Sequence, residues 1–347
     1  MPSLPQLAVP KGSTVLVTGA NGLLGSHIAD QFLAYGYKVR GTVRDLEKSS
    51  WLADVFVKNY GKGSFELVKV PDMAAKSAFD EAVKASILTF DFNPHNVIPD
   101  VIAGAMNALQ AAYAESSVKR FLFTSSSAAA VSSSIGAAGS KVTEETWNED
   151  AIKEAWAETP YTPERATSVY SASKTQAEQE VWKYHKGHQS ERPDLVVNTV
   201  LPNVNFGKSV DPIHQGFASS AKMPALLYNG HVVDFHHMVP RQYFIDTQDT
   251  GRLHVAAGIF EHVQGQRIFG MACRFSWDSI LEILRKIEPE KTFPDNFSGG
   301  EDPNEIEPRD KAEQLLRELG RPGWTTLEES IRGTLESLHL AEKASSA

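Results

Sequence analysis

The sequence has a single cysteine in 347 residues, Cys273, which excludes an internal disulfide framework and a cysteine-based zinc site. It also lacks any run of about eighteen apolar residues, the length that a membrane-spanning helix needs. Lysine and arginine total 34 against 43 aspartate and glutamate residues, a formal net charge of −9, and no basic tract stands out. We therefore expect neither nucleic acid nor a membrane as a partner.

Targeting signals are scarce as well. The start of the chain, MPSLPQLAVPKG, has neither the basic residues nor the apolar core of a signal peptide. Its end, EKASSA, contains no recognisable retention or peroxisomal signal. We therefore expect a cytoplasmic protein.

What the sequence does have is a regular alternation of short apolar runs with stretches of helical periodicity. Strands are expected at residues 13–20, 38–44, 64–70, 119–127 and 194–203, and we expect 119–127 to be fully buried. Helices are expected from Leu24 to Gly36 and at residues 48–60, 78–84, 98–114 and 169–185. This order predicts an α/β fold with a Rossmann-type, doubly wound parallel sheet.

The alternation weakens beyond residue 203. Residues 209–238 read as loop-rich, and residues 293–308, which are rich in Pro, Asp and Glu, also read as a loop. Helices are expected at 277–287, at 310–319 and from Leu327 onward. We therefore divide the chain into a dinucleotide-binding Rossmann domain, 1–203, and a smaller α/β substrate-binding region, 204–347, partly interleaved with the first.

A glycine-rich turn, TGANGLLG, joins the first strand to the first helix. Gly19 permits the tight turn, Gly22 lets the backbone approach a pyrophosphate, and Gly25 lets the helix pack close to the strand. We count Asn21 and Leu23 of the same motif as cofactor contacts. A glycine triplet also marks ordinary turns, but its place between a strand and a helix predicts a dinucleotide site.

The end of the second strand indicates which dinucleotide binds. An NAD site usually carries an acidic residue there, whereas this chain has Arg44, with Lys48 further on. A guanidinium suits a 2′-phosphate, which favours NADP(H); the alternative is that Arg44 is a solvated charge at a strand end. Asp72, at the end of the third strand, either binds the adenine amino group or caps a helix, and Met73 beside it is counted as a cofactor contact.

Tyr170 and Lys174, in YSASK, stand four residues apart at the start of a helix, so both project from one face. An unperturbed tyrosine has a pKa of about 10, and a neighbouring ammonium favours its phenolate. The same lysine can hold the nicotinamide ribose. Such a pair is common by chance, but together with the glycine turn and a strand that ends in serines it predicts a catalytic site.

The strand end FLFTSSS supplies the hydroxyl that polarises a carbonyl group. We choose Ser126, with Ser127 as the rival, and count Thr124 as a cofactor contact. In the predicted reaction, hydride passes to the carbonyl carbon while Ser126 holds the oxygen and Tyr170 supplies the proton. No metal site is expected, because the histidines that cluster in sequence lack carboxylates or cysteines at ligand spacing; they are His231, His236 and His237.

Together these motifs resemble the extended short-chain dehydrogenase/reductases, and more closely the fungal NADPH-dependent aldehyde and carbonyl reductases of the dihydroflavonol-reductase-like branch. The resemblance rests on TGANGLLG, VRGTVR, FLFTSSS, YSASK and LPN, and it extends to KTFPDNF and GRPGWTTLEESI near the C-terminus. It implies that NADPH reduces aldehydes, ketones or keto esters to alcohols. The partner is then a small-molecule carbonyl substrate, and the protein a monomer or homodimer.

The resemblance also implies roles for individual residues. It makes Ser126, Tyr170 and Lys174 the catalytic residues. Val101 stands near the place where many members carry a helix asparagine, so a proton relay through that asparagine is absent. The residues implied to line the nicotinamide pocket and, more loosely, to shape substrate preference are Pro202 and Asn203, and Val239 and Gln242.

The chain departs from this family after Lys84. In the family, the helix after the third strand ends in a turn, and a buried Val-x-His-x-Ala strand then leads into an Ala-Ser loop beside the cofactor. Here DEAVK, ending at Lys84, matches the helix, and Ala85 and Ser86 match the loop, so about eight residues are absent by that comparison. Helix-to-strand connections usually take about 2–6 residues, and Ala85 and Ser86 alone precede Ile87.

The absent strand would lie between the first strand and residues 119–127. Each backbone group left buried and unpaired costs about 1–3 kcal/mol, against about 5–15 kcal/mol for the stability of a whole domain. Either residues 85–90 take the vacant place, with the wall over the cofactor lost or rebuilt from 91–96, or the chain folds poorly. We hypothesise impaired or absent activity, and wild-type-like kinetics of the purified chain would contradict this.

Two alternative functions stay open. One is a sugar-nucleotide epimerase or hydroxysteroid-type dehydrogenase on the same fold; Arg44 disfavours the epimerase, which usually holds NAD tightly. The other is an NADP-binding protein with impaired or no catalysis, which senses redox state or pairs with a partner. The intact Ser126, Tyr170 and Lys174 argue against it, and the gap after Lys84 argues for it.

Overall fold

The computed structural model describes residues 5–74, 91–131 and 139–346. The five elements predicted before residue 74 are all present, with ends shifted by a few residues: β1 (Thr14–Val17), α1 (Leu23–Ala34), β2 (Lys38–Val43), α2 (Ser50–Tyr60) and β3 (Phe65–Lys69). The predicted helix at 78–84 and the segment 85–90 lie outside the described residues.

In the middle of the chain the predicted helices and strands are again confirmed: α3 (Ile98–Ala114), β4 (Arg120–Thr124), α5 (Ala166–His188) and β6 (Val196–Pro202). Two short elements between β4 and α5 were not predicted: β5 (Lys141–Val142) and α4 (Glu149–Ala155). Short 3-10 turns precede α3 and follow β4, at Pro94–Asn96 and Ser127–Ala129.

The last third contains more regular structure than the sequence indicated. The three predicted helices are α9 (Trp277–Ile287), α10 (Arg309–Glu318) and α11 (Leu327–Ser345). The region 209–238, expected to be loop-rich, contains α6 (Lys222–Tyr228) and α7 (Asp234–Met238). The elements that the sequence reading missed are β7 (Val204–Phe206), β8 (Arg241–Asp246), α8 (Thr247–Ile259), β9 (Arg267–Gly270), β10 (Cys273–Ser276) and β11 (Glu305–Ile306).

The described strands form two parallel three-stranded sheets, a third three-stranded sheet and a two-stranded one. The first has the order β1–β2–β3, with Thr14 opposite Lys38. The second has the order β4–β6–β9, with Thr124 opposite Val200. The third three-stranded sheet, β10–β8–β7, comes from the later part of the chain, and the two-stranded sheet pairs β11 with β5. The fold is therefore of the α/β class with parallel sheets, as predicted.

β1 and β4 each pair with a described strand along one edge, whereas an inner strand of a continuous sheet pairs along both edges. Among the described residues, no strand pairs with β1 on the side away from β2, or with β4 on the side away from β6. Leu16 on β1 is 41% exposed, and every residue of β4 is only partly buried. Our expectation of full burial at 119–127 was wrong, because β4 borders a cavity here.

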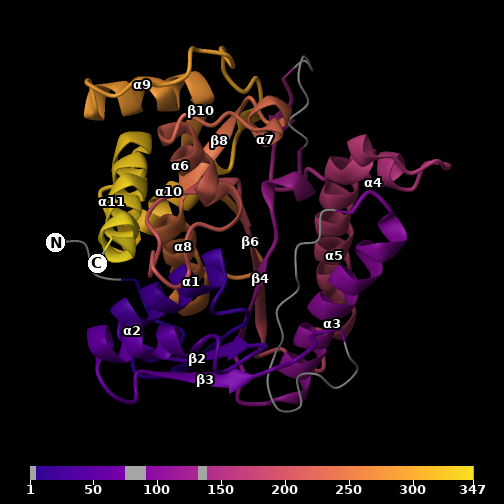
Figure 1. The fold of residues 1–347 in the computed structure, drawn as a ribbon. Coiled ribbons are helices and arrows are strands. Elements are labelled where there is room, and N and C mark those ends of the chain that lie inside the picture. The colour runs from indigo at the N-terminus through magenta and orange to yellow at the C-terminus, as the bar shows by residue number, and fades with distance from the viewer. Residues whose placement is uncertain (1–4, 75–90, 132–138, 347) are drawn as a thin grey trace.

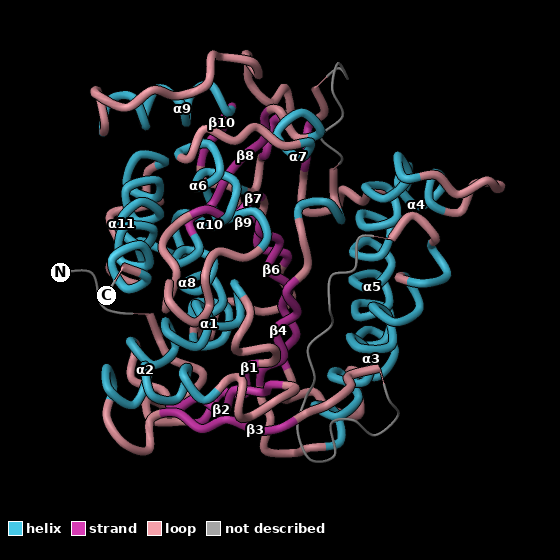
Figure 2. The backbone as a smooth tube through the Cα atoms, in the orientation of Figure 1, coloured by secondary structure: helices cyan, strands magenta, loops and turns pink. Residues whose placement is uncertain are grey.

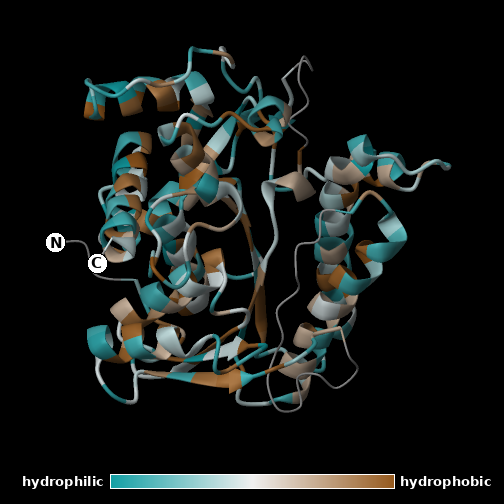
Figure 3. Ribbon diagram, in the orientation of Figure 1, coloured by the Kyte–Doolittle hydropathy of each residue, from teal (hydrophilic) through white to brown (hydrophobic). Residues whose placement is uncertain are grey.

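Helices cover the β4–β6–β9 sheet on both faces (Figures 1 and 2). α3 and α5 lie side by side on one face, and α8, which packs on α1, covers the other. Hydrophobic residues concentrate on the strands and alternate with hydrophilic ones along the helices (Figure 3). The largest buried cluster joins Val17 and Phe32 to Val200 and Leu253, so the two parallel sheets share one core. Of the helices in the described part, none is long and apolar enough to cross a membrane.

Candidate active site

A cavity of about 2130 Å³ is lined by the flanks of β1 and β4 and by the residues that follow β1, β4 and β6. Pockets for small ligands usually measure about 300–1,000 Å³, so this cavity has more room than one small substrate needs. Most of the predicted site residues line it: Gly19, Gly22, Leu23, Gly25, Met73, Thr124, Ser126, Tyr170, Lys174, Pro202, Asn203, Val239 and Gln242. Four do not: Asn21, Arg44, Lys48 and Asp72.

The glycine turn has the geometry that a bound pyrophosphate requires. Gly19 has a φ of +58°, a conformation that residues with side chains rarely adopt. A Cβ on Gly25 would collide with the carbonyl of Gly19, so glycine alone lets α1 begin this close to the turn. Gly22 occupies the N-cap of α1 without a side-chain cap, which leaves the first N–H groups of the helix available to an anion.

A glutamine far along the chain supports this turn. The Nε2 atom of Gln215 donates to the carbonyl oxygen of Gly22 at 3.2 Å and to Oγ of Ser26 at 2.8 Å. On the other side, the backbone N–H of Gly19 donates to Oγ1 of Thr42 on β2 at 3.2 Å. Neither Gln215 nor Thr42 carried a sequence signal, because their roles depend on contacts between distant segments.

The two cationic residues expected to recognise a 2′-phosphate stand in solvent beyond β2. Arg44 and Lys48 are exposed, and the ammonium of Lys48 lies 4.0 Å from the carboxylate of Asp45. Asp72 is exposed as well, and its carboxylate accepts a hydrogen bond from the N–H of Ala74 at 3.1 Å. Met73 lines the cavity and approaches Gly104 on α3.

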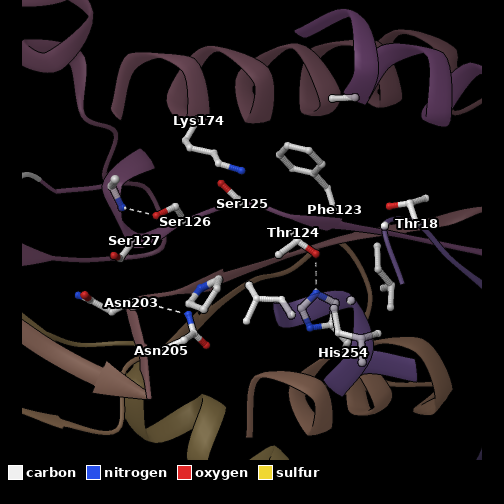
Figure 4. A pocket seen from close by; sticks show the side chains of 18 of the residues that line it. Thr18, Phe123, Thr124, Ser125, Ser126, Ser127, Lys174, Asn203, Asn205 and His254 are labelled. Atoms are coloured by element: carbon white, nitrogen blue, oxygen red, sulfur yellow. Dashed lines mark hydrogen bonds between the residues drawn. The ribbon is translucent and has the colours of Figure 1, made fainter. Parts of the chain in front are cut away.

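The serines that follow β4 separate into different roles. Ser126 is the N-cap of the 3-10 turn Ser127–Ala129, and its Oγ accepts a hydrogen bond from the N–H of Ala128 at 3.2 Å. The side chain of Ser126 is also hydrogen-bonded to Tyr170, whereas Ser127 points away from Lys174 (Figure 4). The geometry therefore favours Ser126 over Ser127 as the partner of the tyrosine.

The electrostatics of Tyr170 and Lys174 follow from burial. Burial raises the pKa of Tyr170, and the hydrogen bond with Ser126 opposes this rise. Burial lowers the pKa of Lys174 to about 8, against an opposing contribution from the carboxylate of Glu178. At neutral pH the tyrosine is therefore a protonated acid and the lysine is still mostly an ammonium.

Thr124, at the end of β4, is held by a buried histidine. Burial lowers the pKa of His254 to about 4, so its ring is neutral. Nδ1 lies 2.8 Å from the carbonyl oxygen of Thr250, which only accepts, so Nδ1 carries the proton. Nε2 is then an acceptor, and the hydroxyl of Thr124 donates to it at 2.8 Å (Figure 4). His254 was not predicted.

The far side of the cavity comes from the region after β6. Pro202 and Asn203 follow one another at its edge, and the amide of Asn205 donates to the carbonyl of Asn203 at 2.8 Å. Val239 and Gln242 line the cavity from the segment around β8. Residues 91–96, expected as a possible new wall, form a loop and a 3-10 turn and do not line the cavity.

The residues present fit a dinucleotide. Gly25, without a side chain, lets α1 begin against the turn, and the first amides of α1 have no side-chain cap, so they remain available to a pyrophosphate. The exposed Arg44 and Lys48 supply positive charge for a phosphate. Among the described residues, no group of three or more His, Cys, Asp and Glu side chains is arranged to hold a metal ion.

Three comparisons with known proteins agree with this geometry. Residues 15–257 match the model of the NAD dependent epimerase/dehydratase family. The chain is 37% identical to aldehyde reductase 2 of Sporidiobolus salmonicolor over 97% of this chain and 99% of that protein. It is 35% identical to a ketoreductase of Penicillium rubens, with 94% and 96% covered.

Solved structures share the fold. The structure of Gre2 from Candida albicans in complex with NADPH is 26% identical, with a TM-score of 0.78 over 96% of this chain and 99% of that one. Vestitone reductase from alfalfa, at 20% identity, has a TM-score of 0.70. The described sheets therefore correspond to a Rossmann-type reductase fold. The chain is an oxidoreductase that belongs to the NAD dependent epimerase/dehydratase family, the extended short-chain dehydrogenase/reductases.

Proposed function

We propose that this protein reduces aldehydes, ketones or keto esters to alcohols with NADPH, and that Tyr170 is the proton donor. The observation that carries the proposal is the meeting, in one cavity, of the glycine turn with the hydrogen-bonded pair Ser126 and Tyr170 and with Lys174 one helical turn further on. Relatives named as an aldehyde reductase and a ketoreductase, at 37% and 35% identity, support the substrate class.

The chain's own residues provide the binding site for the cofactor. The glycine turn and the first amides of α1 hold the pyrophosphate, and Arg44 and Lys48 bind the 2′-phosphate. Pro202 and Asn203 border the nicotinamide end of the cavity. When bound there, NADPH supplies a hydride to the carbonyl carbon of the substrate.

Three side chains then act on the carbonyl oxygen. The Ser126 hydroxyl donates a hydrogen bond to it and so favours the charge that develops there. Tyr170 transfers its hydroxyl proton to the same oxygen, because its raised pKa keeps it protonated until the oxygen becomes basic. The ammonium of Lys174 stabilises the phenolate that is left. Val239 and Gln242 contact the substrate from the opposite side of the cavity.

The test is NADPH oxidation by the purified chain with a panel of aldehydes, ketones and keto esters, compared with Tyr170→Phe. We expect turnover by the wild-type chain and a loss of about 10²–10⁴-fold in kcat for the variant, with NADPH affinity retained. Undiminished turnover by Tyr170→Phe would contradict the assignment of the proton donor.

A second candidate is an NADP-binding protein with impaired catalysis. It is favoured by the flank of β1, which pairs with no described strand. Saturable NADPH binding without turnover of any carbonyl in the panel would support this candidate over the first.

A further inference from the structure

A buried glutamate lies one helical turn beyond Lys174. Glu178 on α5 is fully buried, and Tyr170, Lys174 and Glu178 follow one another at intervals of four residues, which places them on one face of the helix. The mechanism above gives Glu178 no part. A buried carboxylate is costly unless it is paired and hydrogen-bonded, so its contacts need an explanation.

Both oxygens of Glu178 accept hydrogen bonds from groups in or directly after three strands. The hydroxyl of Ser125, at the end of β4, donates to Oε2 at 2.7 Å, and that of Thr199 on β6 donates to Oε1 at 2.7 Å. Arg267, the first residue of β9, donates from Nε to Oε1 at 2.8 Å and from its second terminal nitrogen to Oε2 at 3.3 Å. One side chain of the catalytic helix is thus hydrogen-bonded to β6, to β9 and to the residue that directly follows β4.

The guanidinium of Arg267 also has hydrogen-bond acceptors on the side that faces away from Glu178. It donates to the carbonyl oxygens of Glu144 at 2.8 Å and Thr146 at 2.7 Å, and it stacks over the ring of Trp147 with its central carbon 3.8 Å from the ring centre. The pair is therefore a buried, bidentate ion pair with its remaining donors used. Removing either partner would leave the other as an unpaired buried charge.

This network ends beside the catalytic groups. Ser125 directly precedes Ser126, and the amine of Lys174 points toward Ser125 in the close view (Figure 4). The carboxylate of Glu178 is the charged group that opposes the lowering of the Lys174 pKa by burial. Tyr170 on the same helix and His254 on α8 line the same cavity, and Arg267 on β9 pairs with Glu178.

We infer that Glu178 is a positioning residue. Its hydrogen bonds hold the turn of α5 that carries Lys174 against the end of β4, and its carboxylate places a negative charge near the Lys174 ammonium. The inference rests on the proposed function, in which that ammonium assists Tyr170. It extends that function, because it adds the buried Glu178–Arg267 pair, on the side of α5 that faces the sheet, to the groups that support Lys174.

The test reads the protonation of Lys174 directly. Trace labelling of lysines with acetic anhydride across a pH series, quantified by mass spectrometry of the peptides, gives an apparent pKa for each lysine. We expect a value near 8 for Lys174 in the wild-type chain and a value lower by about one unit in Glu178→Gln, because an opposite charge nearby raises a lysine pKa by about 1–3 units. An unchanged value would overturn the inference.

Activity provides a second, independent readout. Below its pKa Lys174 is the ammonium, so lowering that pKa moves the alkaline limb of kcat/KM to lower pH by the same amount. Glu178→Gln should lose several-fold activity at pH 8 and recover part of it at pH 6. If the wild-type chain shows no reductase activity, the proposed function fails, while the labelling experiment still decides the role of Glu178.

Two further variants separate charge from folding. Glu180→Gln makes the same chemical change at an exposed carboxylate of α5 that pairs with Lys183, and it should leave the Lys174 pKa and the pH profile unchanged. Glu178→Gln/Arg267→Gln removes both buried charges and keeps hydrogen-bonding groups, which avoids the stranded arginine if the single variant does not fold. Because the positive charge of Arg267 also disfavours the Lys174 ammonium, the double variant should lower the Lys174 pKa less than Glu178→Gln does. A Lys174 pKa at or above the wild-type value in this folded variant would overturn the inference.

Discussion

The two parallel sheets of this protein differ in how far their strands are buried and hydrogen-bonded to neighbouring elements. In the β4–β6–β9 sheet, β6 is almost wholly buried, and Glu178 on α5 is hydrogen-bonded to β6, to β9 and to Ser125, which directly follows β4. In the β1–β2–β3 sheet, Val17 is the one buried residue of β1, and Leu16 is 41% exposed. The groups proposed for chemistry follow the well-held sheet, whereas the glycine turn follows β1.

The glycine turn takes its remaining support from the later part of the chain. Gln215 bonds to its backbone, and the ring of His27 on α1 donates to the carbonyl of Lys208 at 2.9 Å. α1 also packs so closely on α8 that a Cβ on Gly251 would lie 2.6 Å from the carbonyl oxygen of His27. We therefore expect incomplete strand pairing beside β1 to lower stability and cofactor affinity before it disturbs Ser126, Tyr170 and Lys174.

Adding a strand beside β1 should make the two sheets alike in strand pairing, and this change should have the largest effect on stability. A chimera that carries a turn and a strand of the Val-x-His-x-Ala type between Lys84 and Ala85 should pair several backbone groups, each worth about 1–3 kcal/mol. The free energy of unfolding in urea should rise by several kcal/mol, and NADPH should bind more tightly by fluorescence. A chimera with the stability and affinity of the parent would show that the β1 flank is already satisfied.

Within the well-held sheet, Ser126 and Ser127 form a matched pair. Ser126→Ala should lower kcat by about 10²–10³-fold, the usual effect of removing one donor to a developing oxyanion. Ser127→Ala should stay within a few-fold of the parent, because that side chain points away from Lys174. Steady-state kinetics at saturating NADPH measures both, and the reverse order of effects would identify Ser127 as the substrate contact.

On the cofactor side, Arg44→Ala should weaken NADPH binding by about 10–100-fold, since hydrogen bonds to charged groups contribute about 1.5–3 kcal/mol. NADH, which lacks the 2′-phosphate, should bind the variant and the parent equally. Lys58→Ala, which removes a positive charge from the last turn of α2, serves as the control for long-range charge effects. Equal losses for NADPH and NADH would contradict the assigned phosphate contact.

The smallest expected effect comes from a substitution at the exposed edge of β1. Leu16→Ala should change the free energy of unfolding by less than about 1 kcal/mol, as at other exposed positions. Leu201→Ala on the fully buried β6 should cost about 2–5 kcal/mol. Denaturant titrations of the two variants compare the sheets directly, and a similar cost at both positions would mean that Leu16 is covered in solution.

Local pattern was enough for the main described helices and strands up to β6 and for the central residues of the site. The spacing of Tyr170 and Lys174, the glycines of the turn and the strand that leads to Ser126 are short-range features, and the fold brings them into one cavity. The sequence reading failed on α8, which is buried almost throughout and contains Asp249, Arg252 and His254 inside the protein. A helix without an exposed face has no amphipathic period to detect.

The sequence by itself determined the order of strands and helices, the glycine turn and the residue types available for proton transfer, because these depend on neighbours within a few positions. Only the tertiary structure decided that Ser126 meets Tyr170, that Gln215 supports the glycine turn, and that Glu178 is buried against Arg267 instead of being a solvated helix charge. These contacts join residues far apart in the chain, and burial, which sets both the cost of a charge and its pKa, exists only once the elements have packed.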